Sequence, residues 1–125
     1  MNVVDSSAWL EYFADGPNAS WFASAIETTN ELIVPSLTIY EVFKKLTSVS
    51  GENAALQAIG AMQQAQVVDL DAALALSAAR LGLKHQLPLA DSIILATARS
   101  FDATLWTQDS DFQGLPDIKY KRATK

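Results

Sequence analysis

The chain has 125 residues, half of them hydrophobic, and its 14 acidic and nine basic side chains give it a net charge of −5. This length and apolar content predict one globular domain over residues 1–125 and exclude a disordered chain. The absence of cysteine excludes a disulfide framework, the single histidine argues against a conventional zinc site, and the negative charge argues against capture of nucleic acid by phosphate neutralisation alone.

Short apolar runs alternate along the chain with segments of helical hydrophobic periodicity. In chain order, the pattern predicts a strand at 3–4, helices from Ser6 and over 19–29, a strand at 32–34 ended by Pro35, and helices from Ser36 to about Gly51 and over 53–64. It then predicts a strand at 67–70, helices at 71–86 (capped by Asp71) and 89–101, and strands at 103–106 and 118–120. This alternation is typical of a three-layer α/β/α sandwich with a mostly parallel sheet, here of four to five strands joined by right-handed crossovers.

The sequence gives no sign of membrane insertion or export. No apolar run approaches the roughly 20 residues that a membrane-spanning helix needs. The N-terminus has no basic region followed by an apolar block, which is the pattern of a secretory signal. Together with the absence of cysteine, these features favour a cytoplasmic protein.

A basic tail is predicted at about residues 119–125. It contains four of the nine basic residues, Lys119, Lys121, Arg122 and Lys125. We expect a loose, solvated end, because chain termini are usually poorly ordered. Acidic residues gathered elsewhere in one cleft would attract nucleic acid only if a bound metal reversed their local charge.

Acidic residues recur where predicted strands end or helices begin. Asp5 and Asp109 directly follow strands, Glu41 lies in the helix after the second strand, and Asp91 lies in the first turn of the helix that leads into the fourth. Parallel strands end at one edge of a sheet, where α/β proteins hold their ligands, so these carboxylates are expected to meet there. Carboxylates placed so close repel one another unless a cation lies between them. Oxygen ligands without histidine or cysteine favour Mg²⁺ or Mn²⁺, which activate water for phosphodiester hydrolysis.

Each acid also has an ordinary structural explanation. Asp5 suits a helix cap, Asp91 complements a helix dipole, and Glu41 could form an exposed ion pair with Lys45 one turn later. The individual signals are weak, and the shared position of the acids carries the metal hypothesis. Asp109 and Asp111 could equally be turn and cap residues, and cap or turn formation is the favoured explanation for the neighbouring hydroxyl residues Ser6 and Thr107. The two hydroxyls among them could instead position water or a phosphate oxygen.

Several aromatic side chains are ambiguous between core and surface. Trp9, Tyr12 and Phe13 lie in the first predicted helix, and Tyr40 lies in the helix after the second strand. For the first three we expect packing in the core rather than a groove for a partner, while Tyr40 is left open.

Four segments resemble, in order and spacing, the acidic motifs of PIN-domain ribonucleases. They are VVDSSAWLEYF, SLTIYEVFKKL, LPLADSIILATARSF and LWTQDSDFQGLPDIKY. The small size of the chain and the segment DLDAALALSAARLGLKHQLPLAD look most like the VapC toxins of bacterial toxin–antitoxin pairs. The resemblance covers nearly the whole chain, and residues 88–116 are its most specific part.

The resemblance implies a set of metal ligands. The family's metal-binding carboxylates match Asp5, Glu41, Asp91 and Asp109. An auxiliary acid of the last motif matches Asp111, and Thr107 matches the small hydroxyl residue before it. Which of Asp109 and Asp111 faces the metal is open, because the Asp-Ser-Asp spacing offers both.

The resemblance also implies an activity and partners. It implies Mg²⁺- or Mn²⁺-dependent cleavage of single-stranded or looped RNA, often tRNA or rRNA, by a homodimer with a cognate antitoxin. The antitoxin would lay an apolar helix or extended segment into a groove near the first helices. Asp5 and Asp91 would be the principal metal ligands, Glu41 and Asp109 would complete or orient the ligand shell, and a metal-activated water would attack the phosphodiester.

Two other functions fit these residues less well than an endoribonuclease does, and one alternative remains. A phosphoacceptor signalling domain would need an acidic pair and a lysine after a late strand, whereas Asp5 stands alone and no lysine follows Trp106 directly. A haloacid-dehalogenase-type phosphatase would need an acid where Ser7 stands. The remaining alternative is a non-catalytic PIN-like module that binds RNA or protein.

Overall fold

A single parallel sheet forms the centre of the molecule in a computed structural model that describes residues 1–124. The strands lie in the order β3-β2-β1-β4-β5, and every neighbouring pair is parallel. The expected sheet is therefore confirmed, with five strands. Their bounds are β1 Asn2–Val4, β2 Leu32–Pro35, β3 Gln66–Val68, β4 Thr104–Thr107 and β5 Ile118–Tyr120.

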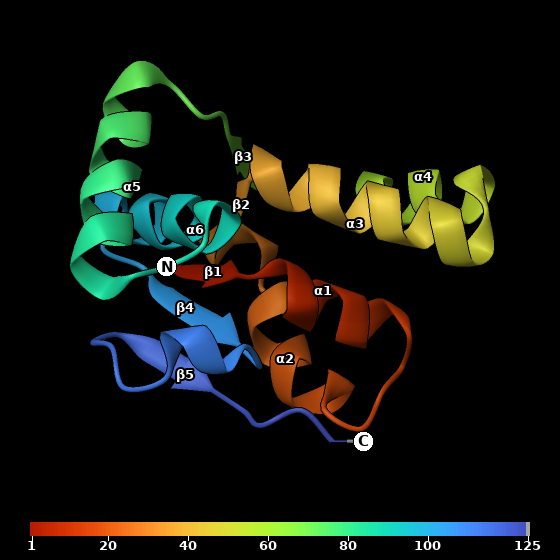
Figure 1. Ribbon diagram of the computed structural model, residues 1–125. Helices are drawn as coiled ribbons and strands as arrows, with labels where there is room; N and C mark the ends of the chain where they lie inside the picture. Colours follow the sequence, from red (N-terminus) through yellow and green to blue (C-terminus); the bar gives the residue numbers. More distant parts are fainter. Residues whose placement is uncertain (125) are drawn as a thin grey trace.

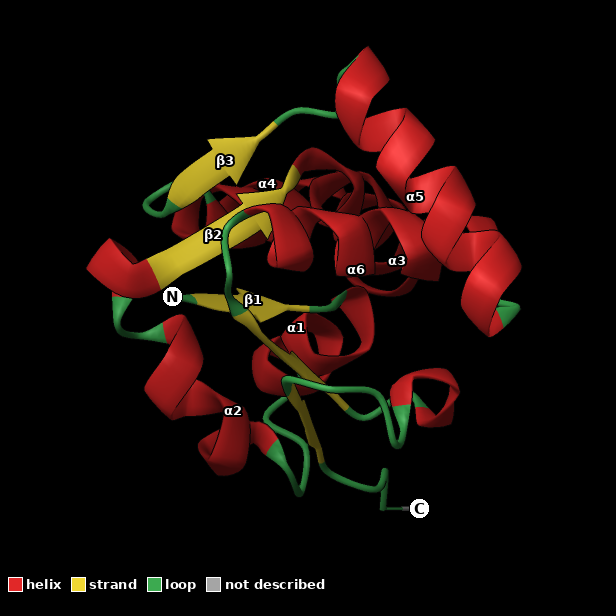
Figure 2. Ribbon diagram, turned by 90° about the vertical axis from the view of Figure 1, so that its left-hand side faces the viewer, coloured by secondary structure: helices red, strands yellow, loops and turns green. Residues whose placement is uncertain are grey.

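Six α-helices cover the two faces of the sheet (Figure 1). Figure 2 shows α2 on one side of the strands, with α5 and α6 on the other. In Figure 1, α3 and α4 form a hairpin that projects beyond the sheet. The helices are α1 Ser6–Phe13, α2 Ala19–Ile26, α3 Ser36–Ser50, α4 Glu52–Met62, α5 Ala72–His85 and α6 Leu89–Ser100.

Alternation along the strands divides the core between the two faces. Val4 and Val34 pack with Phe22 and the other side chains of the α1/α2/α4 side. Their neighbours Val3 and Ile33 point the other way and pack against α6. Successive side chains of a strand point to opposite faces, so short valine- and isoleucine-rich strands serve both cores of the sandwich.

Element boundaries differ from the predicted ones by a few residues. Pro35 is the last residue of β2 and the N-cap of α3 rather than a strand terminator. The helix predicted over 19–29 ends at Ile26, and a separate 3₁₀ turn covers Thr29–Glu31. The hydroxyl of Thr28 donates to the carbonyl oxygen of Ser24 at 2.8 Å. This bond competes with helical pairing and helps to end α2 there.

The chain is held in place almost to its end. Lys119 lies in β5 with its ammonium 4.5 Å from the ring centre of Trp106, and the Asn18 amide donates to the carbonyl oxygen of Arg122 at 2.9 Å. As far as Arg122, sheet pairing and side-chain contacts hold the backbone of this segment, and its basic side chains are exposed. Lys125 lies outside the described residues. Within residues 1–124, no helix combines the length and hydrophobicity needed to cross a membrane.

Candidate metal centre

The carboxyl ends of β1 and β4 and the first turns of α1, α3 and α6 meet at one edge of the sheet. In Figure 1 the starts of α1 and α3 lie close together near the centre of the molecule. A cavity of about 310 Å³ opens at this edge. Its lining is acidic and hydroxyl-rich, with a single basic side chain, and consists of Asp5, Ser6, Ser7, Leu10, Glu41, Lys45, Asp91, Ile94 and Asp109. Four of the predicted site acids therefore share one cavity.

Asp5 is both a helix cap and a wall of this cavity. It is 3% exposed, and its Oδ1 accepts the Ala8 N–H at 3.1 Å and the Ser7 hydroxyl at 2.8 Å. Its Oδ2 accepts the Thr107 hydroxyl at 2.7 Å. Burial raises the pKa of Asp5 to about 6, although all three hydrogen bonds act to lower it. Capping and a place in the site are therefore compatible for this residue.

Three further acids converge from α6 and from the segment after β4. Asp91, Asp109 and Asp111 each offer an oxygen atom within 4.8 Å of the other two. Burial and then the negative charge of Asp109 raise the pKa of Asp91 to about 8. Asp109 lies at the cavity, whereas Asp111 is exposed at its rim. Both remain within reach of a cation at Asp91.

Thr107 connects the two groups of acids. Its buried hydroxyl donates to Asp5 and accepts the backbone N–H of Asp109 at 2.8 Å. Asp109 in turn accepts the N–H of Asp111 at 2.9 Å, which caps the 3₁₀ turn Ser110–Phe112. One hydroxyl at the end of β4 thereby sets the position of acids from two strands.

Glu41 approaches from α3. It is half-buried and accepts a hydrogen bond from the Ser6 hydroxyl at the start of α1. Lys45, one turn further along α3, also lines the cavity. Glu41 is therefore less exposed than the expected surface ion pair implies, Lys45 is exposed, and both side chains line the acidic cavity.

The model of the PIN domain family matches residues 3–118. The chain belongs to this family. No curated protein matches the sequence. Solved structures with similar folds include a toxin–antitoxin complex from Klebsiella pneumoniae, with 22% identity and a TM-score of 0.80 over 94% of this chain and 95% of that chain. VapC20 from Mycobacterium tuberculosis, a Sarcin-Ricin loop cleaving toxin, gives 17% identity and a TM-score of 0.78 over 95% and 98% of the two chains. VapBC2 from Rickettsia felis, bound to a DNA fragment from its promoter, gives 12% identity and a TM-score of 0.74 over 97% of each chain.

These likenesses show that the PIN domain has the VapC fold. The predicted three-layer α/β/α architecture and the resemblance to VapC-type PIN domains are thus confirmed. The structure also brings the predicted ligand positions to one place, because the strand and helix ends that carry them share one edge of the sheet.

The donor set of the PIN domain fits a hard divalent cation. Asp91, Asp109 and Asp111 offer carboxylate oxygens within 4.8 Å of one another, and Asp5 and Glu41 line the cavity that Asp91 and Asp109 share. In the protein alone, burial and then the nearby carboxylates raise the pKa of Asp91. A cation between them would offset that repulsion.

Sequence patterns missed three side chains that organise the site. Turn capping was the favoured explanation for Ser6 and Thr107, but both hydroxyls donate to site carboxylates. Lys45, expected in a surface ion pair, is exposed and also lines the cavity. Position is a signal for two of them, because Ser6 begins α1 and Thr107 ends β4 at the sheet edge where the acids meet.

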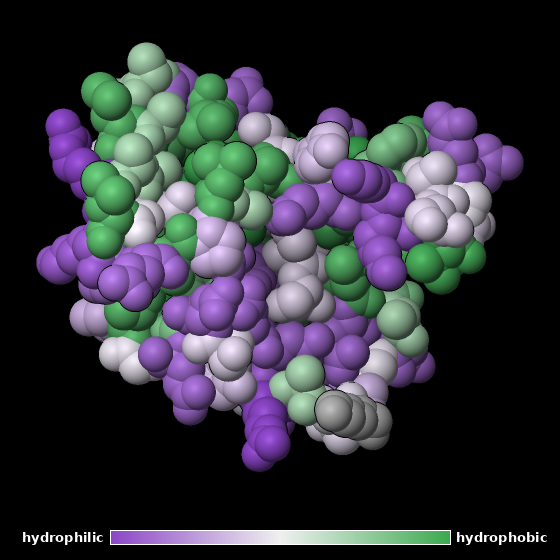
Figure 3. Space-filling model, viewed as in Figure 1, coloured by the Kyte–Doolittle hydropathy of each residue, from purple (hydrophilic) through white to green (hydrophobic). Residues whose placement is uncertain are grey.

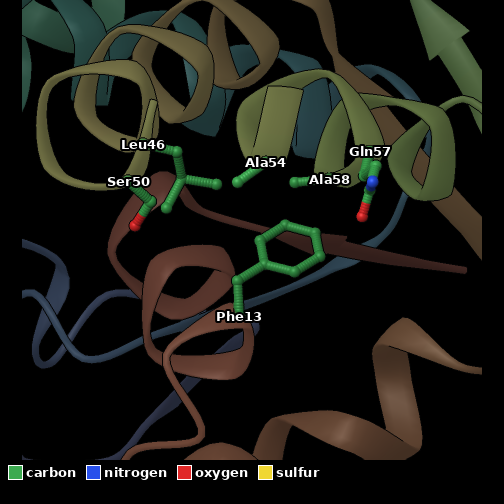
Figure 4. Close-up of a pocket in the computed structure, with 6 residues that line it drawn as sticks. All are labelled: Phe13, Leu46, Ser50, Ala54, Gln57 and Ala58. Atoms are coloured by element: carbon green, nitrogen blue, oxygen red, sulfur yellow. The ribbon is translucent and has the colours of Figure 1, made fainter. Parts of the chain in front are cut away.

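The aromatic residues of the PIN domain divide between core and surface. Trp9 is 1% exposed and belongs to the core, as expected. Tyr12 is partly exposed and donates its hydroxyl to Glu27 at 2.8 Å. Phe13 points into a separate groove beneath the α3–α4 hairpin, towards Leu46 and Ala58 (Figure 4). Tyr40 is 60% exposed.

Proposed function

We propose that this PIN domain is a metal-dependent endoribonuclease and the toxin of a toxin–antitoxin pair. The observation that carries the proposal is the convergence of Asp5, Asp91 and Asp109 at one cavity, with the pKa of Asp91 raised by burial and by its acidic neighbour. The substrate would be single-stranded or looped RNA, such as tRNA or rRNA, and the ion Mg²⁺ or Mn²⁺. A homodimer and a cytoplasmic location are proposed with it from the family resemblance.

The site residues would divide the work of holding the cation. Asp5 and Asp91 would be the principal ligands, Glu41 and Asp109 would complete or orient the shell, and Asp111 would act from the rim. When bound, the cation would activate water and offset the charge that develops on the phosphoryl group. The fixed hydrogen bonds of Asp5 prevent its carboxylate from turning away, so the ligand geometry exists before substrate arrives.

An antitoxin is the proposed protein partner. The support is the fold shared with chains solved in toxin–antitoxin complexes and an apolar groove of about 310 Å³ between α1 and the α3–α4 hairpin (Figure 4). An apolar helix or extended segment of the antitoxin would cover Phe13 there. The remaining lining is mostly small or apolar, with Leu46, Ser50, Ala54, Gln57 and Ala58.

The experiment compares RNA cleavage in Mg²⁺ by the wild type and by the Asp5→Asn and Asp91→Asn proteins. Asparagine keeps the shape of aspartate and can still cap α1 in place of Asp5, and Asp91 caps no helix, so both variants should fold. We expect cleavage by each to fall at least 100-fold, a loss typical of removing one electrostatic group from a site, and the growth arrest caused by expression to disappear.

Asp69→Asn is the matched control. Asp69 is exposed and lies against Ser100 and Phe101, at the opposite end of α6 from Asp91. It should cleave like the wild type. Full cleavage by either site variant would remove the mechanism, and folded protein that binds no Mn²⁺ by calorimetry would favour a non-catalytic PIN module.

A further inference from the structure

A second cavity adjoins the acidic one along α3. It has a volume of about 320 Å³ and is lined by Tyr40, Glu41, Lys44, Lys45 and Ser48. Glu41 and Lys45 line both cavities. The two cavities therefore share a wall, and a chain that occupies the first can pass over Glu41 and Lys45 into the second.

Helix geometry arranges these side chains in two columns. Residues four apart lie on the same face, about 6 Å apart along the axis. Glu41 and Lys45 form the column that faces the acids, and Tyr40 and Lys44 form the column beside it. The Lys44 ammonium lies 5.7 Å from the ring centre of Tyr40. Figure 3 shows hydrophilic side chains gathered over the middle of α3.

The chemistry of this second cavity suits a single-stranded nucleotide. Tyr40 exposes 60% of its surface, although a large aromatic side chain is usually buried. Lys44 and Lys45 are both exposed beside it. Proteins bind single strands with aromatic rings on which bases stack and with basic side chains that follow the phosphates.

We infer that Tyr40, Lys44 and Lys45 form a nucleotide subsite for the RNA strand next to the cleaved bond. Lys45 contacts a phosphate at the border of the acidic cavity, a base stacks on Tyr40, and Lys44 contacts the following phosphate. This inference rests on the proposed ribonuclease function. It also explains how a chain with a net charge of −5 can hold a polyanion, since the two lysines place positive charge where the strand leaves the acids.

An RNA occupant fits this surface better than a protein segment does. The five lining residues comprise one aromatic ring and four polar or charged side chains. The groove at Phe13, by contrast, offers Leu46 and two alanines. Apolar partner segments suit the groove, and a charged, stackable strand suits the Tyr40 surface.

The test measures RNA binding in the Asp91→Asn protein, so that no cleavage interferes. The probes are a labelled single-stranded RNA of about 12 nucleotides, within the roughly 4 to 16 that single-strand sites cover, and the same backbone with abasic residues at its centre. When Tyr40→Leu is combined with Asp91→Asn, binding of the intact RNA should weaken about fivefold or more, because base stacking is lost. The substitution should leave binding of the abasic probe unchanged.

Lysine removal should act differently. Added Lys45→Gln should weaken binding of both probes and reduce the slope of log affinity against log salt concentration by about 0.7, the value for one phosphate contact on a single strand. Lys44→Gln should act in the same direction. Arg99→Gln is the control, because Arg99 is exposed in the last turn of α6, far from Asp91, and it should change neither affinity nor slope.

The outcomes separate this inference from the nuclease proposal. If the Asp91→Asn parent binds RNA and the Tyr40 and lysine variants bind it equally well, the subsite is overturned while the nuclease proposal stands. The Tyr40 surface would then belong to a protein partner. If the wild type cleaves no RNA and the parent binds none, both proposals fail together. Thermal melting of each variant confirms folding, which these exposed positions should not affect.

Discussion

At the scale of the residue, single hydroxyl groups fix the positions of the acidic side chains in the cavity. Thr107 is fully buried and lies between Asp5 and the backbone of Asp109. A hydrogen bond to a charged group contributes more than a neutral one, about 1.5–3 kcal/mol. The hydroxyl is thus important both for the stability of the fold and for the orientation of two proposed ligands.

Thr107→Val removes this hydroxyl and keeps the shape of the side chain. We expect the free energy of unfolding to fall by about 1–3 kcal/mol, because Asp5 loses a buried donor, and RNA cleavage to fall as both acids lose their orientation. Denaturant unfolding and cleavage rates measure the two effects. Thr107→Ser retains the donor and should keep most of the activity, so equal loss in both variants would contradict this role.

The pKa values of Asp5 and Asp91 make the metal-free protein sensitive to pH. Both are raised above the ordinary value of 3.8, to about 6 and about 8. At pH values between 3.8 and the raised pKa of each group, the folded state holds a proton that the unfolded chain has released. The free energy of unfolding therefore falls as pH rises through this range. In EDTA, the free energy of unfolding should decrease from pH 5 to pH 8. In the Asp91→Asn protein, the free energy of unfolding should decrease less over this pH range. If it decreases as much as in the wild type, Asp91 is not a source of the pH dependence.

At the scale of the element, hydrophobic pattern predicted most of the architecture and the position of the acids. Asp5 and Asp91 could be placed at one sheet edge because strand and helix order alone determines which ends meet there. The hydroxyl partners could not be placed this way. Ser6 and Glu41 are 35 residues apart, and Thr107 and Asp5 are 102 apart, so their pairing depends on side-chain packing that periodicity does not describe.

The α3–α4 hairpin depends on one residue with unusual backbone geometry. Gly51 lies between the two helices with φ +90° and ψ 163°, a region open almost only to glycine. Nothing lies within 4 Å of an added Cβ, so the cost of Gly51→Ala is conformational and should be about 1–3 kcal/mol of unfolding free energy. Gly60→Ala in α4 also meets no atoms and should stabilise the protein by about 0.5–1 kcal/mol. Denaturant unfolding measures both changes, and equal changes in the free energy of unfolding for Gly51→Ala and Gly60→Ala would contradict this account.

At the scale of the whole molecule, net charge describes the surface poorly. The total of −5 argues against phosphate capture, yet four of the acids share one cavity, Lys45 also lines it, and Lys44 lies in the adjoining cavity. A cation in that cavity would offset much of the negative charge at the point where the strand would be cut. Binding of metal and binding of RNA should therefore depend on each other.

Metal binding should also stabilise the fold as a whole, because the unfolded chain cannot bring Asp5, Asp91 and Asp109 together. A ligand that binds only the folded state adds about 2.7 kcal/mol at 100 times its dissociation constant. For a domain of this size, that corresponds to a rise on the order of 10 °C in melting temperature. Mn²⁺ titration followed by thermal melting should show this rise in the wild type and in Asp69→Asn, and little of it in Asp91→Asn. A rise of the same size in Asp91→Asn would place the stabilising ion at some other part of the surface, because that variant lacks the carboxylate at the centre of the cluster.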